Sequence, residues 1–382
     1  MSIFSIFDSA INIVLLLLFL VPLVVIHEAG HFIAARRAGV RVHEFGVGFP
    51  PRAKTLGVDK HGTAYTLNWL PIGGFVRLEG EEGESVDPTA FVNQRLRTRL
   101  VILFAGVTMN FLLAFIIFTL IAVVADPVMQ VRVGGVQPGS PAEVAGLQAG
   151  QIIGTQTDDQ GNEFPIYDQS GDLIVAIDGQ RFLMFDAVGS PDAPLAYLRA
   201  HAGQTVNLTV RNAAGVERQV QATLRVPTPT QGALGISNLR FEQEPTTHDP
   251  LTAVSKGVWR TVDASTLILR GLGGLITDLT NPQVSGPVGI VGAIGQVRTQ
   301  LPPVFLIWLI GLLSANLAVI NVLPFPPLDG GRVAVAIIQR ASNNRIGVAA
   351  ERLVYLTGFI LLMVLLVWLT LFDTGILQRR SL

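Results

Sequence analysis

Two histidines and a glutamate lie inside an apolar stretch near the start of the chain, Val24–Phe32 (VVIHEAGHF). On a helix, His27 and His31 are four residues apart and project from one face, so that both imidazoles can bind a single Zn²⁺. Glu28 lies beside them as a candidate general base. Ionisable groups are costly inside apolar spans and usually have a function there. The pattern therefore predicts a zinc site with a base next to it.

A zinc ion needs a further protein ligand, and the chain has no cysteine to supply one. Asp329, in the stretch NVLPFPPLDGG, is the candidate, because its carboxylate is the hard oxygen ligand that a pair of histidines lacks. An alternative is that Asp329 only caps the helical run that follows the prolines. His43 is a remote alternative ligand, whereas His61, His201 and His248 are expected to be structural.

The composition indicates a membrane protein. Of the 382 residues, 49% are hydrophobic and 14% are charged, whereas about 25% are charged in typical soluble domains. The formal net charge is −1, and no block of Lys and Arg indicates a nucleic-acid partner. The absence of cysteine leaves the redox compartment open.

Long apolar runs predict a polytopic α-helical membrane protein with four transmembrane helices, because about 20 residues cross a hydrocarbon core. The first run, Ala10–Ile26, continues through the histidine motif. A cleaved signal peptide is the competing interpretation, but residues 1–9 contain no Lys or Arg. The later runs are Leu100–Ala125, Val304–Val322 and Leu353–Phe372.

The distribution of basic residues predicts the orientation of the chain. Arg36, Arg37 and Arg41 follow the first span, and further basic residues lie between 52 and 97, so this side is expected to face the cytoplasm. Three crossings then return Asp329 to the side of the histidine motif. Both termini are expected to be extracytoplasmic, with the active site toward the cytoplasm.

The connection after the first span contains candidate strands. Thr63–Leu70 is β-branched and aromatic, and PIGGFVRL is expected to form a second strand after a Pro/Gly turn. Together with Phe45–Pro50, these segments suggest a small β-sheet beside the first helix. An unpaired edge of such a sheet can bind an extended peptide, and the alternative is a plain cytoplasmic hairpin.

Prolines end the third apolar span, and an amide side chain lies inside the second. Pro324, Pro326 and Pro327 end the third span, and a break there is tolerated only where the backbone is buried in protein or lines a wet cavity. Asn110 lies within the second span, where it either joins helices together or supports a nearby site.

The composition of residues 127–226 differs from that of the apolar spans. It predicts an extracytoplasmic α+β domain. The stretch VQPGSPAEVAGLQAG, followed by GDLIVAIDGQ, resembles a PDZ domain with a short helix at Pro141–Ala145 and an Asp-Gly turn at Asp178 and Gly179. The chain departs from that pattern by an insertion at Gln151–Ser170.

A polar connection, Pro227–Pro250, follows this domain. Apolar residues then recur at helical spacing from Leu251 to Leu279, which predicts an amphipathic helix, or two helices broken near Gly271–Gly274. Such a helix lies on the membrane surface or covers the transmembrane bundle, unless it packs inside a soluble domain. The Gly-rich stretch Ser285–Gly295 can pack closely against helices or form a turn.

These features divide the chain into consecutive segments. We expect a first transmembrane helix at 1–35, a cytoplasmic-side β-loop region at 36–98, a second transmembrane helix at 99–126, the PDZ-like domain at 127–226 with its insertion near 151–170, a linker with amphipathic helices at 227–302, a third transmembrane segment at 303–340, and the fourth helix with the C-terminus at 341–382.

The combination of HEAGH, PIGGFV, a PDZ-like module and NVLPFPPLDGG resembles the site-two protease family of intramembrane zinc metalloproteases, of the bacterial type that acts in regulated intramembrane proteolysis. The resemblance covers nearly the whole chain. It implies that His27, His31 and Asp329 bind zinc and that Glu28 is the catalytic base. It also implies that substrate is met by six further residues: Gly73, Gly74, Phe75, Asn321, Pro324 and Pro326.

The resemblance further implies a location in the bacterial inner membrane and substrates that are single-pass membrane proteins, such as anti-sigma factors or signal-peptide remnants. A non-proteolytic zinc-binding scaffold that binds peptides through the PDZ-like domain is the main alternative. A zinc transporter is a second one, although the spans contain few polar residues outside the two motifs. The oligomeric state stays open.

Overall fold

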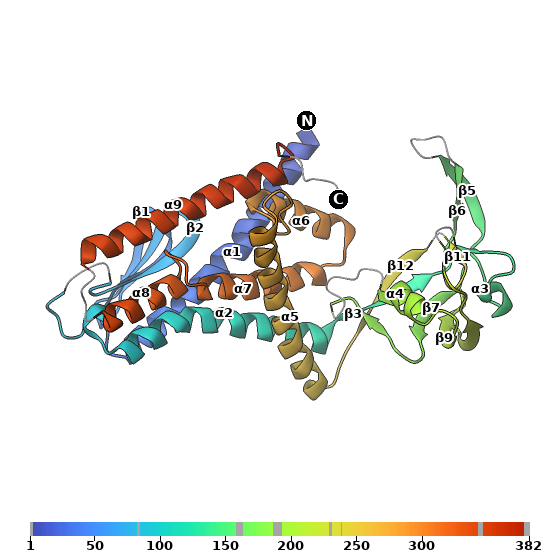
Figure 1. Ribbon diagram of the computed structural model, residues 1–382, viewed down its shortest axis with the longest axis horizontal. Coiled ribbons are helices and arrows are strands. Elements are labelled where there is room, and N and C mark those ends of the chain that lie inside the picture. The colour runs from blue at the N-terminus through green and yellow to red at the C-terminus, as the bar shows by residue number, and fades with distance from the viewer. Residues whose placement is uncertain are drawn as a thin grey trace. The chain divides into compact units, whose positions relative to one another are not determined.

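The computed structural model describes residues 3–81, 85–157, 163–185, 193–228, 231–237, 239–342 and 347–377. It divides into two compact units, of which unit 1 contains residues 1–121 and 254–382 and unit 2 contains residues 122–253 (Figure 1). Residues 158–162 of the predicted insertion and the last five residues of the chain lie outside the described residues.

Unit 1 is mainly helical. Its helices are α1 (Ile3–Arg37), α2 (Leu96–Val124), α5 (Pro250–Thr277), α6 (Pro287–Gln300), α7 (Val304–Val322), α8 (Asp329–Ala341) and α9 (Val348–Asp373). Among the described residues, α1, α2, α7 and α9 are long and apolar enough to cross a membrane. The prediction of four apolar spans is therefore confirmed by helix length and composition.

Small residues bring the backbones of α1 and α2 together. A Cβ atom on Gly30 would lie 2.4 Å from the carbonyl oxygen of Ala105, so only glycine fits at that position of α1. Farther along, buried apolar side chains join both helices to the first strands in one core, which contains Ala35, Val42, Val76 and Ile102. This packing fixes the face of α1 that carries the histidine motif against α2.

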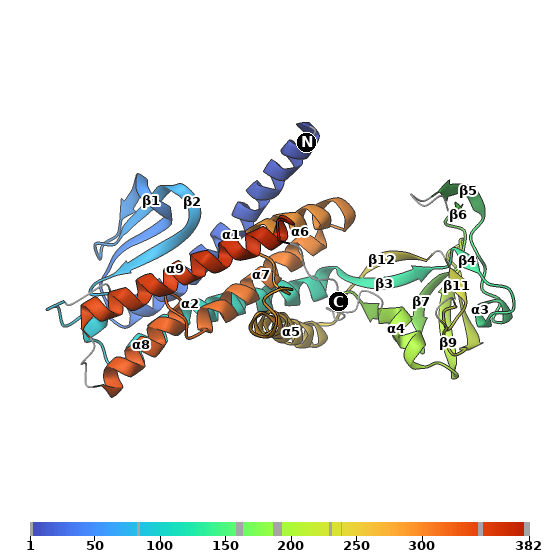
Figure 2. The same cartoon turned by 45° about the horizontal axis from the view of Figure 1, so that its top comes forward.

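Strands β1 (Val42–Val58) and β2 (Ala64–Leu78) form the small sheet expected after the first helix. Residues 44–47 pair both with residues 64–67 and with residues 74–77, so β2 bends around the end of this segment at its Pro/Gly sequence. The predicted separate strands are thus two parts of β2. Figure 2 shows the curved pair lying over the C-terminal part of α1.

The chain breaks between α7 and α8, as the three prolines predicted. Helix α7 ends at Val322 and α8 begins at Asp329. The first turn of α8 packs against the broken segment itself, because a Cβ atom on Gly330 would lie 2.1 Å from the carbonyl oxygen of Val322 and one on Gly331 would lie 2.5 Å from Pro326 N. These contacts hold Asp329 close to the end of α7.

Two later helices differ from the sequence predictions. Helix α5 is continuous through residues 271–274, so the alternative of two broken helices is wrong. The Gly-rich stretch forms the start of α6 instead of a turn, and its glycines permit close contacts: a Cβ on Gly295 would lie 2.5 Å from the Asn12 side chain, and one on Gly289 would lie 2.8 Å from Asp373.

Unit 2 is an α+β domain with a central sheet ordered β10-β9-β7-β3-β12, in which β8 also pairs with β3. Its core is formed by buried residues such as Leu208 and Ile177. The elements are β3 (Asp126–Arg132), β4 (Gly135–Val136), α3 (Pro141–Val144), β5 (Ile152–Thr157), β6 (Glu163–Tyr167), β7 (Leu173–Ile177), β8 (Phe182–Leu183), α4 (Ala193–Ala200), β9 (Thr205–Arg211), β10 (Glu217–Thr223), β11 (Ile236–Ser237) and β12 (Arg240–Thr246).

Two parts of unit 2 modify the predicted domain plan. The insertion supplies β5 and β6, which pair with each other as a separate two-stranded sheet. Residues 240–246, assigned above to a polar connection, form β12 and pair with β3 along its whole length. The domain therefore continues past residue 226, because its first strand needs this late segment as a partner.

Candidate metal centre

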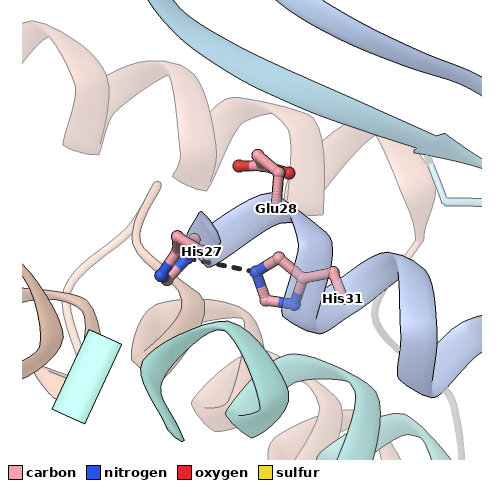
Figure 3. Close-up of side chains that lie close together, drawn as sticks. All are labelled: His27, Glu28 and His31. Atoms are coloured by element: carbon pink, nitrogen blue, oxygen red, sulfur yellow. Dashed lines mark hydrogen bonds between the residues drawn. The ribbon is translucent and has the colours of Figure 1, made fainter. Parts of the chain in front are cut away.

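The side chains of His27, His31 and Asp329 converge at one point of unit 1. The Nε2 atoms of the two imidazoles are 3.1 Å apart, and Asp329 Oδ2 lies 2.9 Å from that of His27 and 3.2 Å from that of His31. Figure 3 shows the two imidazoles on neighbouring turns of α1 with Glu28 beside them. Residues from both ends of the chain thus meet in one small cluster.

The hydrogen bond made by His31 Nδ1 determines which nitrogen of the ring carries the proton. Its Nδ1 lies 2.8 Å from the Ile102 carbonyl oxygen, which can only accept, so Nδ1 carries a proton and donates it. In the neutral ring, Nε2 then presents a lone pair toward the carboxylate of Asp329. This Nε2 lone pair and the carboxylate oxygen, 3.2 Å apart, are both donor atoms that a metal ion can accept.

The cluster fits zinc. Ligand atoms about 2.0–2.2 Å from a tetrahedral zinc ion lie roughly 3.3 Å from one another, and the three distances here are only slightly shorter. Two imidazoles and one carboxylate are also a ligand set that catalytic zinc sites use, with a fourth position left for water or substrate. All three side chains are mostly buried, which limits competition from bulk water.

Asp329 is the first residue of α8, and the N-cap residue is Leu328. Its Oδ2 atom faces both imidazoles. The interpretation of Asp329 as a helix cap alone is therefore wrong. Glu28 also lies near the histidines, with a ligand atom within 4.8 Å of theirs, but Asp329 is closer to both.

Asn110 of α2 contacts the far side of the His27 ring. It is fully buried, and its amide nitrogen lies 3.3 Å from His27 Nδ1. Its Oδ1 atom has no hydrogen-bond partner among the described residues. A half-turn of the amide would bring Oδ1 to Nδ1–H of His27, which is the arrangement that leaves Nε2 free to bind a metal. Of the two roles expected for Asn110, support of the site agrees with this contact.

Gly106 was missed by the sequence analysis. A Cβ atom at this position of α2 would lie 2.5 Å from His31 Nε2 and 2.8 Å from His27 Nε2. Any other residue would therefore occupy the space in front of both imidazoles. A glycine within an apolar helix carries no chemical signal, so only the packing of α1 against α2 reveals this position.

A cavity of about 350 Å³ opens from the cluster. Of the residues that the resemblance assigned to substrate, Gly74, Phe75 and Asn321 line it, together with Glu28. Gly74 is close to Glu28, since a Cβ atom there would lie 3.8 Å from Glu28 Cγ. The strand edge of β2 thus borders the cavity beside Glu28.

The remaining three positions assigned to substrate do not line this cavity. Gly73 lies next to the ring of Phe49, and Pro324 is exposed. Pro326 packs against helices, because Cβ atoms on Gly331 and Gly358 would lie 2.5 Å and 2.0 Å from its backbone. Pro326 therefore packs against α8 and α9 and does not face this cavity.

The other histidines have partners elsewhere. His43 is not in the group of close ligand atoms around His27 and His31, and its Nε2 lies 2.5 Å from Glu79 Oε2, so the described residues give no support to the alternative of His43 as a ligand. His201 stacks on Tyr197, and His248 pairs with Asp126 inside unit 2. His61 lies in the turn between β1 and β2, where its backbone N–H donates to Asp59.

Comparison with known proteins agrees with this geometry. A family model described as Peptidase family M50 matches residues 15–365. A putative zinc metalloprotease of Clostridium perfringens is 33% identical over 364 residues, covering 94% of this chain and 98% of that protein. One of Clostridium acetobutylicum is 29% identical over 366 residues (96% and 98%), and the zinc metalloprotease RasP of Oceanobacillus iheyensis is 29% identical over 432 residues (91% and 95%).

Proposed function

The chain belongs to peptidase family M50 and is a zinc metalloprotease, and we propose that it hydrolyses a peptide bond in or near the transmembrane helix of single-pass membrane proteins. The observation that carries this proposal is the convergence of Asp329 Oδ2 on the Nε2 atoms of His27 and His31. These residues are the proposed zinc ligands. When bound by these residues, a zinc ion would polarise the scissile carbonyl and would lower the pKa of water to about 7.

Glu28 is the proposed general base. It lines the cavity next to the proposed ligands and is free of a ligand role, because Asp329 supplies the carboxylate. From this position Glu28 takes a proton from the attacking water and later donates it to the leaving amine. Asn110 and the Ile102 carbonyl hold the two imidazoles in the orientation that the site requires.

The strand edge at residues 74–78 is the proposed binding site for the substrate backbone. This segment of β2 pairs with residues 42–47 on one side, and the described residues provide no strand on its other side. A transmembrane helix hides its carbonyl groups in its own hydrogen bonds, so it must unwind before it is cut. The free edge beside Glu28 supplies replacement partners for the opened backbone.

The proposed location is the inner membrane of a bacterium. The four apolar helices support membrane insertion, and the basic residues after α1 support a cytoplasmic position for the site, with both termini and unit 2 outside. Anti-sigma factors and signal-peptide remnants are the proposed substrate classes. The proposed route of water to the site passes by the break between α7 and α8, since broken helices are tolerated at membrane depth where they line a wet cavity.

Cleavage of a single-pass reporter protein by the purified enzyme in detergent or liposomes tests the function. We expect wild type to cut it and Glu28→Gln to lose activity by at least about 10²-fold while it retains zinc, since the base contributes about 10²–10⁴-fold. Glu217→Gln, on the exposed surface of unit 2, is the matched control and should behave as wild type. Equal cleavage by Glu28→Gln would exclude Glu28 as the base, and zinc binding without cleavage by wild type would favour the scaffold alternative.

For unit 2 we propose a PDZ-like role in screening substrates by the size or the new C-terminus of their external part. The experiment is deletion of the whole unit, residues 122–253, since deletion of 127–226 alone would leave β12 without β3. We expect the deletion variant to cut reporters with large external domains that wild type cuts only after they have been trimmed. An unchanged need for trimming would contradict this role.

A further inference from the structure

A second cavity of about 550 Å³ adjoins the one at the metal centre. It is lined by residues of β1 and β2 and by Arg332 of α8. Phe49, Phe75, Val76, Glu81 and Arg332 line both cavities. A peptide held beside Glu28 could therefore reach the second cavity within a few residues of the bond that is cut.

One buried carboxylate organises the wall of the second cavity. Glu44 is 3% exposed, and its Oε1 atom accepts hydrogen bonds from Arg52 Nη2 at 2.7 Å and from Thr66 Oγ1 at 2.8 Å. Its Oε2 atom lies 2.9 Å from Arg77 Nη2. These contacts hold two guanidinium groups side by side at the cavity wall.

The second cavity carries an excess of positive charge. Arg332 pairs with Glu81, whereas Arg52 and Arg77 share the single carboxylate of Glu44. Three guanidinium groups therefore face two carboxylates in the lining. The cavity thus favours an anionic ligand over a neutral or cationic one.

The arrangement of donors specifies the chemistry of that ligand. The side chains of Arg52 and Arg77 are about half exposed, at 48% and 56%. Each guanidinium has five N–H donors in a planar fork and uses one nitrogen on Glu44. The donors that face the cavity match a second carboxylate, which guanidinium groups bind in a bidentate manner.

We propose that the second cavity is a specificity subsite for an Asp or Glu side chain of the substrate, located a few residues from the cut bond. This inference rests on the proposed proteolytic function. If the site faces the cytoplasm, the selection is sharp, because the cytoplasmic flanks of membrane spans are rich in Lys and Arg. A subsite that rejects cations excludes most such flanks and accepts the few that carry an acid.

The test uses a cleavable single-pass reporter in which each of about six positions on either side of the cut is changed in turn to Asp, Asn or Lys. An extended residue spans about 3.4 Å, so this scan covers roughly 20 Å in each direction and exceeds the width of the cavity. For wild type we expect one or two neighbouring positions at which kcat/KM for Asp exceeds that for Asn by about 5-fold, with Lys cut most slowly. The preference should decrease as salt concentration rises.

Variants of Arg52 test whether the second cavity causes the preference for Asp. Arg52→Gln removes the excess charge but leaves Glu44 paired with Arg77, so the ratio of Asp to Asn should fall to about 2-fold or less. Arg52→Lys keeps the charge and should keep most of the preference. Arg97→Gln is the matched control, because Arg97 is exposed on α2, outside both cavities, and its ratio should equal that of wild type.

The outcomes separate this inference from the function on which it rests. Equal rates for Asp, Asn and Lys at every position, with wild type active and Glu28→Gln inactive, would overturn the subsite alone. An Asp preference that Arg52→Gln retains would also overturn it, as would a rate that follows anionic lipid content instead of substrate charge. If wild type cuts no reporter faster than Glu28→Gln, the proteolytic function and the subsite both fail.

Discussion

Asp329 Oδ2 lies 2.9 Å from His27 Nε2, although 302 residues separate the two in the sequence. The contact depends on glycine at two interfaces. Gly30 lets α1 and α2 approach, and Gly330 lets α8 turn back on the end of α7. The proposed metal centre is therefore a product of helix packing, in which small residues decide how closely the functional side chains meet.

Gly106→Ala should weaken zinc binding without unfolding the protein. The new Cβ atom would lie 2.5 Å from His31 Nε2, in the space that a metal would share with the imidazoles. We expect at least about a 10-fold loss of zinc affinity, in the range seen when groups that support metal ligands are changed, with a matching loss of cleavage. Zinc content of the purified variant measures this.

Gly273→Ala is the matched control for Gly106→Ala, because a Cβ atom at residue 273 of α5 meets no atom within 4 Å. This variant should bind zinc as wild type does and melt at the same or a slightly higher temperature, since alanine favours helix. Full zinc occupancy in Gly106→Ala would show that the metal does not lie in front of these imidazoles.

Asn110→Leu should weaken zinc binding by about 10–100-fold, because it removes the partner of His27 Nδ1. Asn110→Asp keeps an acceptor at the same distance and should retain more affinity than Asn110→Leu. Titration with a zinc chelator of known affinity gives the dissociation constants. If both variants bind zinc as tightly as wild type does, Asn110 contributes only to helix packing.

The sequence indicates the site residues that a motif identifies, but it does not indicate those whose role depends on helix packing. His27, Glu28 and His31 could be assigned because the spacing of four residues on a helix fixes their common face. Asp329 could be proposed because the count of crossings returns it to the side of the histidine motif and because its carboxylate is a donor that two histidines lack. Gly106 could not, because its role exists only where α2 touches α1.

The same distinction applies to the fold. The apolar spans were readable because each depends on its own composition. Strand β12 was read as a polar connection because its strand character comes from pairing with β3, far away in the sequence. Helix α6 was missed because its glycines weaken the helical signal while they permit contacts with α1 and α9.

Acidification should weaken the attachment of the β1–β2 hairpin to the end of α1. Asp59, in the turn of the hairpin, accepts hydrogen bonds from Arg36 and from the backbone N–H groups of Thr63 and His61. The Arg36 guanidinium, followed by these N–H groups, lowers the pKa of the Asp59 carboxyl below its ordinary value. The folded state therefore binds this proton less tightly than the unfolded chain does.

The contribution of Asp59 to stability is thus complete above its ordinary pKa of about 3.9 and is lost as pH falls below that value toward the lower folded pKa. Asp59→Asn should lower the Tm at neutral pH, and the difference from wild type should shrink as pH falls from about 6 to about 3. Thermal unfolding of both proteins across this range measures it. A difference that stays constant with pH would contradict the assignment.

The central claim is that residues from opposite ends of the chain bind one zinc ion. The most direct measurement is zinc bound per chain, by elemental analysis, in wild type, Glu28→Gln and Asp329→Ala purified under the same conditions. We predict about one zinc ion per chain in the first two proteins and less than about a tenth of that content in Asp329→Ala, because three protein ligands are needed for such a site. A zinc content in Asp329→Ala equal to that of wild type would contradict the claim.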